Sequence, residues 1–307
     1  MSKIALHRLR HGLTVFSAAT LFHYSSTSSE SRKLNVKFAH ACLSKNSTIE
    51  RVGAHDPNGC GEDSWVIKET PQQVCLAVAD GVGGWRSKGV DPSQFSRCLM
   101  RQAGLAIEQS PGFYVDSFTA LRKAFWGLVG VWSAGKEKPF GSSTACLVGL
   151  NKQTGELDIA NLGDSGCMIL RPNGESRLER IFRTPVQQTR FNAPYQTTLT
   201  PDGHVNDQTP LADHTRHADV QPGDLIVLAT DGLWDNVWEH EIINLLQQGH
   251  SLEKSAMALV RRAREYGEME TGYDSPVVHE GRLQGKRGLS GGKLDDITVI
   301  LAVIVEE

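Results

Sequence analysis

Three apolar runs, each with an aspartate at one end, constrain this chain more than any other feature of its sequence. The runs with their acidic residues are Ala77-Val78-Ala79-Asp80-Gly81, Leu228-Ala229-Thr230-Asp231-Gly232 and Asp295-Asp296-Ile297-Thr298-Val299. Continuous apolar runs of this kind are typical of strands that are buried on both faces. A carboxylate at the end of such a strand stands on rigid backbone at the edge of a core, where water and ligands can reach it. The pattern therefore predicts buried sheet with acidic side chains along its edge.

Two further acidic groups enlarge this set, although a single Asp-Gly pair after a strand more often forms a hairpin turn. Glu62-Asp63 precedes the first run, and Gly163-Asp164-Ser165-Gly166 lies between two more strands. If these ends converge, the like charges raise one another's pKa values, and a divalent cation would relieve the repulsion. Because the ligands are all oxygens, we predict Mg²⁺ or Mn²⁺ rather than zinc.

The order of helical and strand patterns predicts an α+β fold. Helices are predicted over 91–109, 116–133, 237–248 and 252–266, and strands over 65–68, 74–79, 144–150, 157–162, 167–170, 225–229 and 297–305. Strands before, between and after paired helices favour two mostly antiparallel sheets packed together with helices outside, an α-β-β-α sandwich. Short turns join the strands between 144 and 170, which favours an antiparallel meander. The apolar residues over 35–61 show no strong helical or strand periodicity. Residues 172–216 and 267–294 are predicted to be long loops.

The first 29 residues differ in composition from the rest of the chain. They contain no acidic residue, carry Lys3, Arg8 and Arg10, and end in serine and threonine over 25–29. This composition is typical of a mitochondrial transit peptide. We predict a targeting segment over 1–33, a single domain over 34–307 and a mitochondrial location. A secretory signal peptide and a disordered tail on a cytoplasmic protein are the alternatives.

Charge and cysteine spacing exclude several classes of protein. The formal net charge of −3 argues against a duplex nucleic-acid binder. The apolar stretch 12–22 is shorter than the roughly 20 residues that a membrane span needs, so we predict no stable span, and we expect a monomer. Six cysteines match neither a disulfide framework nor a zinc site, and we predict buried free thiols: Cys42, Cys60, Cys75, Cys98, Cys146 and Cys167.

Six motifs together make the chain resemble the type 2C metal-dependent protein serine/threonine phosphatases over nearly all of residues 50–305. In chain order they are GED (61–63), VADGVGG (78–84), GSSTA (141–145), NLGDSG (161–166), ATDGLWD (229–235) and DDIT (295–298). Two further stretches, 83–96 and FNAPYQ (191–196), are similar to a small mitochondrial, PTC-seven-like branch of that family. The resemblance implies that phosphoserine and phosphothreonine in proteins are hydrolysed by a metal-activated water, without a covalent intermediate.

The resemblance also implies a role for each acidic residue. Asp80 would bridge two Mn²⁺ or Mg²⁺ ions, Gly81 would ligate one through its carbonyl, and Asp231 and Asp295 would complete the other. Asp80, Asp231 and Asp295 are therefore the expected catalytic residues.

Three more residues match positions with supporting roles in the family. Glu62 would act through metal-bound water, with Asp63 as its partner behind the ligands. Asp164 matches the position that holds a third, weaker ion in some members.

Two departures from the family pattern concern the phosphate and the leaving group. Val82 stands where the family places a histidine that is proposed as general acid, and the family's phosphate-binding arginine has no counterpart in residues 56–60. Four arginines of the polar stretch 172–216 are candidates to bind substrate phosphate instead: Arg177, Arg180, Arg183 and Arg190. A catalytically silent phosphoprotein-binding module on the same fold is the alternative function, which the departures favour and the complete set of carboxylates opposes.

Overall fold

The computed structural model describes residues 33–48, 60–175 and 177–307. The predicted targeting segment therefore lies outside the described residues, apart from Lys33. In the described part of the chain, no helix has the length and apolar content that a membrane crossing requires.

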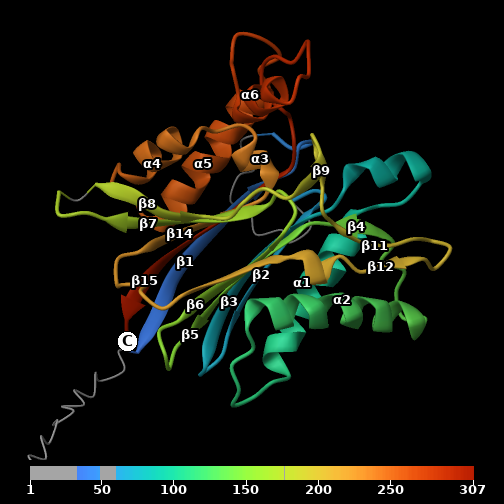
Figure 1. Cartoon of the computed structure of the whole chain (residues 1–307), viewed down its shortest axis with the longest axis horizontal. Helices are drawn as coiled ribbons and strands as arrows, with labels where there is room; N and C mark the ends of the chain where they lie inside the picture. The colour runs from blue at the N-terminus through green and yellow to red at the C-terminus, as the bar shows by residue number, and fades with distance from the viewer. Residues whose placement is uncertain (1–32, 49–59, 176) are drawn as a thin grey trace, which may run out of the picture. The chain divides into compact units, whose positions relative to one another are not determined.

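Two five-stranded sheets form the centre of the domain (Figure 1). The first has the order β1 (Leu34–Leu43), β15 (Ile297–Glu306), β14 (Leu225–Ala229), β7 (Gly166–Pro172) and β8 (Leu178–Arg183). The second has the order β13 (Asp213–His217), β6 (Leu157–Leu162), β5 (Ala145–Asn151), β3 (Gln73–Asp80) and β2 (Asp63–Glu69). Neighbouring strands in both sheets are antiparallel. Side chains such as Val78, Ile159, Ile226 and Ile300 pack between the sheets in one buried cluster.

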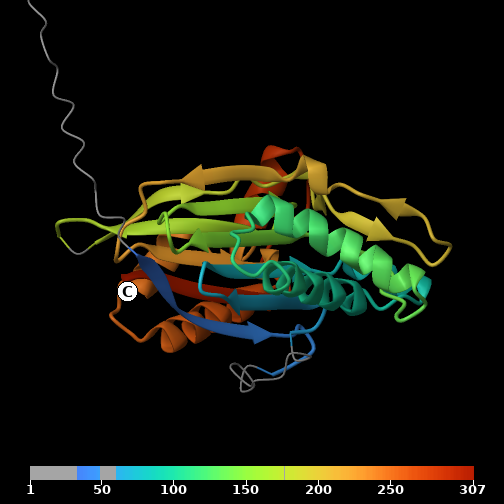
Figure 2. The ribbon, with the colours of Figure 1, turned by 90° about the horizontal axis from the view of Figure 1, so that it is seen from below.

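Helices cover the outer face of each sheet, which confirms the predicted α-β-β-α sandwich (Figures 1 and 2). Helices α1 (Ser93–Glu108) and α2 (Ser117–Ser133) place Leu99 and Phe125 on the second sheet. Helices α4 (Glu239–Leu246) and α5 (Leu252–Gly267) cover the first sheet with side chains such as Leu259. Each fully buried side chain of this size contributes about 1.5–3 kcal/mol to the free energy of unfolding, so the apolar helical stripes hold the layers together.

The turn between β6 and β7 carries the chain from one sheet to the other. Strand β7 pairs with β14 and β8 rather than with β6, so the prediction of one meander over 144–170 is correct for β5 and β6 and wrong for β7. Strands β6 and β7 are both buried on both faces for most of their length, and their apolar patterns are therefore alike. For this reason the sequence pattern does not reveal which sheet a strand joins.

Strand β1 was not predicted, although it pairs with β15 along its whole length, from Leu34 opposite Glu306 to Leu43 opposite Ile297. The sequence over 35–61 shows no strong period, yet the first part of that range forms most of β1. The alternation in β1 is weak, because small alanines at Ala39 and Ala41 occupy buried positions. Long-range pairing with β15 supplies the order that local propensity lacks.

Cys42 and Cys60 form a disulfide, with their Cα atoms 5.4 Å apart. The prediction of free thiols is therefore wrong for these two residues, and it is confirmed for the other four cysteines, which are free and buried. Cys42 lies on β1, so the closeness of the pair depends on the strand that the sequence pattern did not reveal. The bond joins the end of β1 to the residues just before Glu62.

The two predicted long loops contain short regular elements. Between β8 and β14 lie β9 (Gln188–Arg190), β10 (Ala193–Pro194), β11 (Thr197–Leu199), β12 (Val205–Asn206), a 3-10 helix η3 (Thr209–Leu211) and β13. Strand β11 also pairs with β4 (Gly141–Ser143). Helix α6 (Pro276–Leu283) lies within the second predicted loop.

Candidate metal centre

Asp63 and Asp80 lie opposite each other at one end of the second sheet. Asp63 begins β2 and Asp80 ends β3, and their Cα atoms are partners in the antiparallel ladder. The next residue, Gly81, is packed so closely that a Cβ there would stand 2.7 Å from the Glu62 carbonyl oxygen and 2.8 Å from that of Pro92. Only glycine fits this position, and its tight packing places the end of β3 beside Glu62.

Asp164 and Asp231 reach the same place from other segments. Asp164 lies in the turn that crosses from β6 to β7, and Asp231 begins the short helix α3 (Asp231–Trp234) directly after β14. One carboxylate oxygen from each of Asp80, Asp164 and Asp231 lies within 4.8 Å of the others. Three segments far apart in sequence thus converge, and two of them carry the predicted strand-end residues Asp80 and Asp231; Asp164 completes this group, and Asp295 is not part of it.

The electrostatics of these carboxylates fit a divalent cation. Burial raises the pKa of Asp80 well above its usual value, and the charge of Asp231 raises it further. Burial and the charge of Asp231 also raise the pKa of Asp164 well above its usual value. Within the described residues, the buried Oδ1 atoms of Asp164 and Asp231 have no hydrogen-bond donor. A hard ion such as Mn²⁺ or Mg²⁺ would satisfy such oxygens, in competition with protons.

Lys293 links Asp295 to this cluster. Its Nζ contacts Asp231 and lies 2.7 Å from Asp235 Oδ2 and 3.3 Å from Asp295 Oδ2. Burial alone would raise the pKa of Asp231, but the Lys293 ammonium more than offsets this and the pKa is lowered. Burial raises the pKa of Asp235 to about 7, although Lys293 acts in the opposite direction. Lys293 was not predicted from the sequence. The only indication of its role was that a lysine stands two residues before the predicted ligand Asp295.

Glu62 is 2% exposed and contacts two cations. Lys45 Nζ lies 2.6 Å from its Oε2 atom, and Arg86 Nε bonds its Oε1 atom. Lys45 also lies 3.3 Å from Asp295 Oδ1. Neither cation was predicted, because Lys45 follows the unpredicted strand β1, and Arg86, in the 3-10 helix η2 (Gly83–Lys88), follows the matched VADGVGG motif.

Asp63 and Asp296 hold the surrounding backbone. The Oδ2 atom of Asp63 accepts hydrogen bonds from the Thr230 and Thr298 hydroxyls, each 2.8 Å long. Asp296 accepts the Lys45 amide at 2.7 Å and the Glu62 amide at 2.9 Å. Asp63 therefore ties β2 to the ends of β14 and β15.

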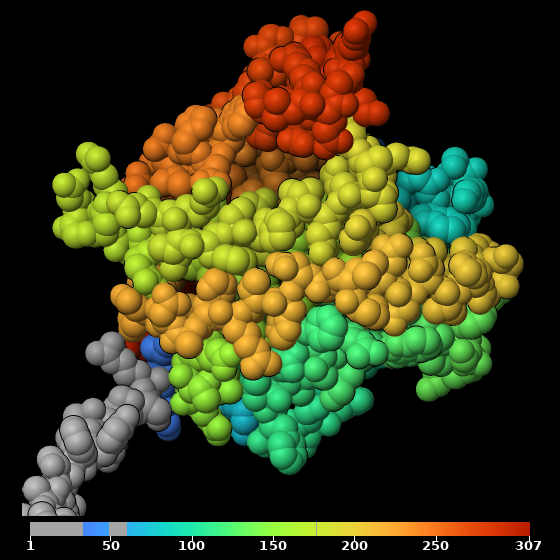
Figure 3. Space-filling model, viewed as in Figure 1, coloured from blue at the N-terminus to red at the C-terminus, as the bar shows by residue number. Residues whose placement is uncertain are grey.

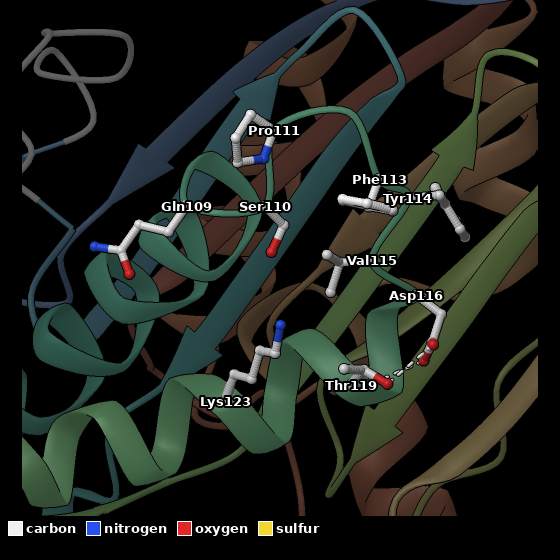
Figure 4. A pocket seen from close by; sticks show the side chains of 9 residues that line it. All are labelled: Gln109, Ser110, Pro111, Phe113, Tyr114, Val115, Asp116, Thr119 and Lys123. Carbon is white, nitrogen blue, oxygen red and sulfur yellow. Dashed lines mark hydrogen bonds between the residues drawn. The ribbon is translucent and has the colours of Figure 1, made fainter.

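A second group of possible ligands, Asp116, Asp158 and His214, lies away from these residues. Asp116 caps the N-terminus of helix α2 and accepts the Thr119 amide at 2.8 Å, beside a surface cavity (Figure 4). Asp158 accepts hydrogen bonds from the Tyr114 hydroxyl and from the Ser117 amide, at 2.5 and 2.6 Å. Because both carboxylates already serve as structural acceptors, this group is a polar network at the start of α2.

Comparisons with known proteins agree with the fold and with these motifs. The family described as protein phosphatase 2C matches residues 55–271. The protein phosphatase PTC7 homolog fig of Drosophila willistoni is 39% identical over 272 residues, covering 82% of this chain and 80% of that protein. The homolog of the same name in Drosophila melanogaster is 38% identical over 255 residues, covering 80% of this chain and 77% of that protein.

Solved structures share the architecture. The photosystem II phosphatase PBCP superposes with a TM-score of 0.69 at 29% identity, covering 88% of this chain and 98% of that chain. The catalytic domain of the serine/threonine protein phosphatase PstP, solved in complex with two manganese ions, has a TM-score of 0.53 at 19% identity over 89% of this chain and 100% of its own. The similarity to the PstP domain shows a shared fold and nothing more. The chain belongs to the protein phosphatase 2C family, the metal-dependent protein serine/threonine phosphatases.

Proposed function

We propose that this phosphatase binds two Mn²⁺ or Mg²⁺ ions through Asp80, the Gly81 carbonyl, Asp231 and Asp295. The observation that carries the proposal is the convergence of Asp80, Asp164 and Asp231 within 4.8 Å. Ions in such a site supply a water activated for attack on phosphorus and neutralise charge on the phosphoryl oxygens. The number of ions is the one that the family resemblance implies.

The remaining acidic residues would have the supporting roles that the family resemblance implies. Glu62 would orient metal-bound water, Asp63 would hold the strand ends behind the ligands, and Asp164 would hold a third, weaker ion. In this arrangement the chain fixes the ligands on strand ends, so little rearrangement is needed when substrate binds.

Calorimetric titration with Mn²⁺, combined with hydrolysis of a chromogenic phosphate ester, tests this proposal. Two strong binding events and activity that depends on them would support it. Metal binding without hydrolysis would favour the catalytically silent phosphoprotein-binding module instead. The complete set of carboxylates is the reason to prefer the enzyme.

We further propose that Arg86 and Lys45 bind the substrate phosphoryl group in place of the missing family arginine. Both contact Glu62, and the Arg86 side chain is 54% exposed, so its guanidinium can be reached from solvent. Among the described residues, the four arginines predicted earlier make no ion pair with a site carboxylate. Arg177 contacts Glu175, Arg180 contacts Glu239, and Arg183 stacks on a tryptophan.

Arg86→Ala is expected to raise the KM for a phosphopeptide by roughly tenfold or more, because a hydrogen bond to a charged group contributes about 1.5–3 kcal/mol. Inhibition by inorganic phosphate should weaken by a similar factor, which gives a second measurement. Arg180→Ala is the matched control, since Arg180 pairs on the surface with Glu239 at 2.7 Å. Equal effects of the two substitutions would contradict this role.

We propose a mitochondrial location, a targeting segment over 1–33, and a single monomeric phosphatase domain over 34–307. The acid-free, basic and serine-rich composition of the first 29 residues supports this, as does the similarity to PTC7 homologs. The phosphorylated proteins on which it acts would then be mitochondrial.

Removal of residues 1–33 is expected to leave phosphatase activity unchanged, because the buried clusters of the described domain are built from residues after this segment. The full chain fused to a fluorescent reporter should accumulate in mitochondria, whereas the truncated chain should not. Fractionation of cells that express both fusions would measure this. Secretion of the full-length fusion would support the signal-peptide alternative.

A further inference from the structure

A cleft of about 510 Å³ leads from the metal centre toward α6. Asp164 and Asp235 line its inner end, and Phe191, Trp234 and Trp238 line its walls. In Figure 3 the surface is hollowed between the red atoms of α6 and the yellow-green atoms below them. The cleft is therefore continuous with the residues that would hold the metal ions.

A second hollow of about 230 Å³ extends the cleft along α6. It shares Phe191 and Val277 with the first and includes Leu289 and Lys293 in its lining. Because Lys293 also contacts Asp231 and Asp295, both hollows open from the same site. We refer to the two together as the groove, defined by Val186, Phe191, Trp234, Trp238, Val277 and Leu289.

The walls of the groove combine the apolar side chains named above with polar ones, among them Arg183, His279 and Glu280. The indole N–H groups of Trp234 and Trp238 each donate a hydrogen bond of 2.9 Å to a backbone carbonyl, those of Ala229 and Asp274. Both indoles have thus used their only donors. The Arg183 guanidinium lies over the Trp234 ring, 3.6 Å from its centroid, so Trp238 is the indole that offers ring surface to a ligand. Val186, at the rim, is 58% exposed, so its side chain adds accessible apolar surface at the mouth of the groove.

Phe191 is held rigidly in the wall. It lies in the turn between β9 and β10, where Asn192 has a φ of 54° and its amide donates to the Gln188 side chain at 3.1 Å. Gln188 also donates to Asp164 Oδ2 at 3.3 Å, which ties the hairpin to the metal centre. On α6, a Cβ at Gly281 would stand 2.8 Å from the Phe191 ring, so glycine is required for the ring to pack there. The FNAPYQ motif thus builds one wall of the groove.

We propose that the groove binds a large apolar side chain that lies next to the phosphorylated serine or threonine of the protein substrate. The inference rests on the proposed function, because the phosphoryl group must lie at the metal centre. Successive residues of an extended substrate chain are about 3.3–3.6 Å apart, so a residue one to three positions away reaches the groove. The apolar side chains of the walls and their continuity with the metal ligands together favour this occupant.

Pairs of phosphopeptides test the proposal with the metal-loaded, full-length enzyme. The members of a pair differ only in leucine or glycine at one position, one to three residues before or after the phosphoserine. The measurement is the selectivity, the ratio of kcat/KM for the leucine peptide to that for the glycine peptide. An apolar pocket typically discriminates by a factor of about 10–200, so we expect a selectivity of roughly tenfold at one position or more.

Phe191→Ala and Val186→Asp are expected to reduce this selectivity toward one. Val186 is on the surface, so its substitution leaves the fold intact, and the ratio corrects for any loss of active enzyme. Phe113→Ala is the matched control: Phe113 is 75% exposed and borders the separate cavity of Figure 4. The control should retain the wild-type selectivity.

Three outcomes would overturn the proposal. The wild-type enzyme could show no preference at any position, the groove substitutions could leave the preference intact, or light scattering could show that they dissociate an oligomer instead. The last result would identify the groove as a contact between two copies of the chain. Metal-dependent hydrolysis of nitrophenyl phosphate is measured in parallel, and its absence would count against the proposed function rather than against the groove.

Discussion

Asp80→Asn is expected to lower turnover about a thousandfold while leaving the fold intact. The substitution keeps the size of the side chain and removes the charge that would bridge two cations. Stabilisation of transition-state charge by bound ions amounts to several kcal/mol, and about 1.4 kcal/mol corresponds to a factor of ten in rate. Asp231→Asn should have an effect of similar size, since its carboxylate lies in the same cluster.

Activity and ion binding should fall together in these variants. The kcat for nitrophenyl phosphate and the calorimetric affinity for Mn²⁺ measure the two effects, and circular dichroism checks the fold. Asp219→Asn is the control, because the Asp219 side chain is 77% exposed and lies outside the cluster. Excess EDTA should abolish wild-type activity. Full activity in EDTA would contradict the proposed metal dependence.

The second large expected effect is the dependence of kcat on the leaving group, and it follows from Val82. This residue follows Asp80-Gly81 directly, and its amide donates to the Ser142 carbonyl at 3.0 Å. By the family resemblance it occupies the position of the expected histidine, and a valine side chain cannot supply a proton. General acid catalysis contributes about 10²–10⁴-fold, chiefly for poor leaving groups. We therefore expect kcat to depend steeply on leaving-group pKa, with nitrophenyl phosphate exceeding phosphoserine peptides by a factor in this range.

Val82→His should flatten this dependence if the imidazole reaches the leaving oxygen. A series of aryl and alkyl phosphates of graded leaving-group pKa, measured for both proteins, gives the slope. Rapid-mixing kinetics must accompany the series, because slow product release would hide the chemical step behind a burst. A flat dependence without a burst would rule out the idea.

Strands with strong local signals were predicted well. Runs such as 74–79 and 225–229 are apolar throughout, because both faces are covered, and β3 and β14 occupy these positions. Strand β1 was missed because its burial depends on β15, more than 250 positions later in the ladder register. The Cys42–Cys60 bond was missed for the same reason. Strand β1 and the disulfide both depend on strand pairing between residues far apart in the chain, which a short stretch of sequence does not reveal.

The carboxylates of the site were predictable for a related reason. Asp80 and Asp231 follow strongly apolar strands, and only their convergence required the structure. Lys45, Arg86 and Lys293 carried no such signal, because a lone cation in a loop usually indicates solvent exposure. Their importance comes from the acidic neighbours that the fold brings to them. A cluster of buried carboxylates is therefore a reason to search for compensating cations elsewhere in the chain.

The pairing of β1 with β15 bears on how the molecule acquires its fold. The last strand lies between β1 and β14 in the first sheet, and Asp295 and Asp296 immediately precede it. The first sheet therefore cannot close until the residues of β15 have left the ribosome. Contacts of such long sequence separation slow folding, because the entropy of closing the chain is lost before they form. During synthesis, the earlier strands and the carboxylates at their ends remain without β15, and a chain truncated before residue 295 would lack both β15 and the proposed metal ligand Asp295.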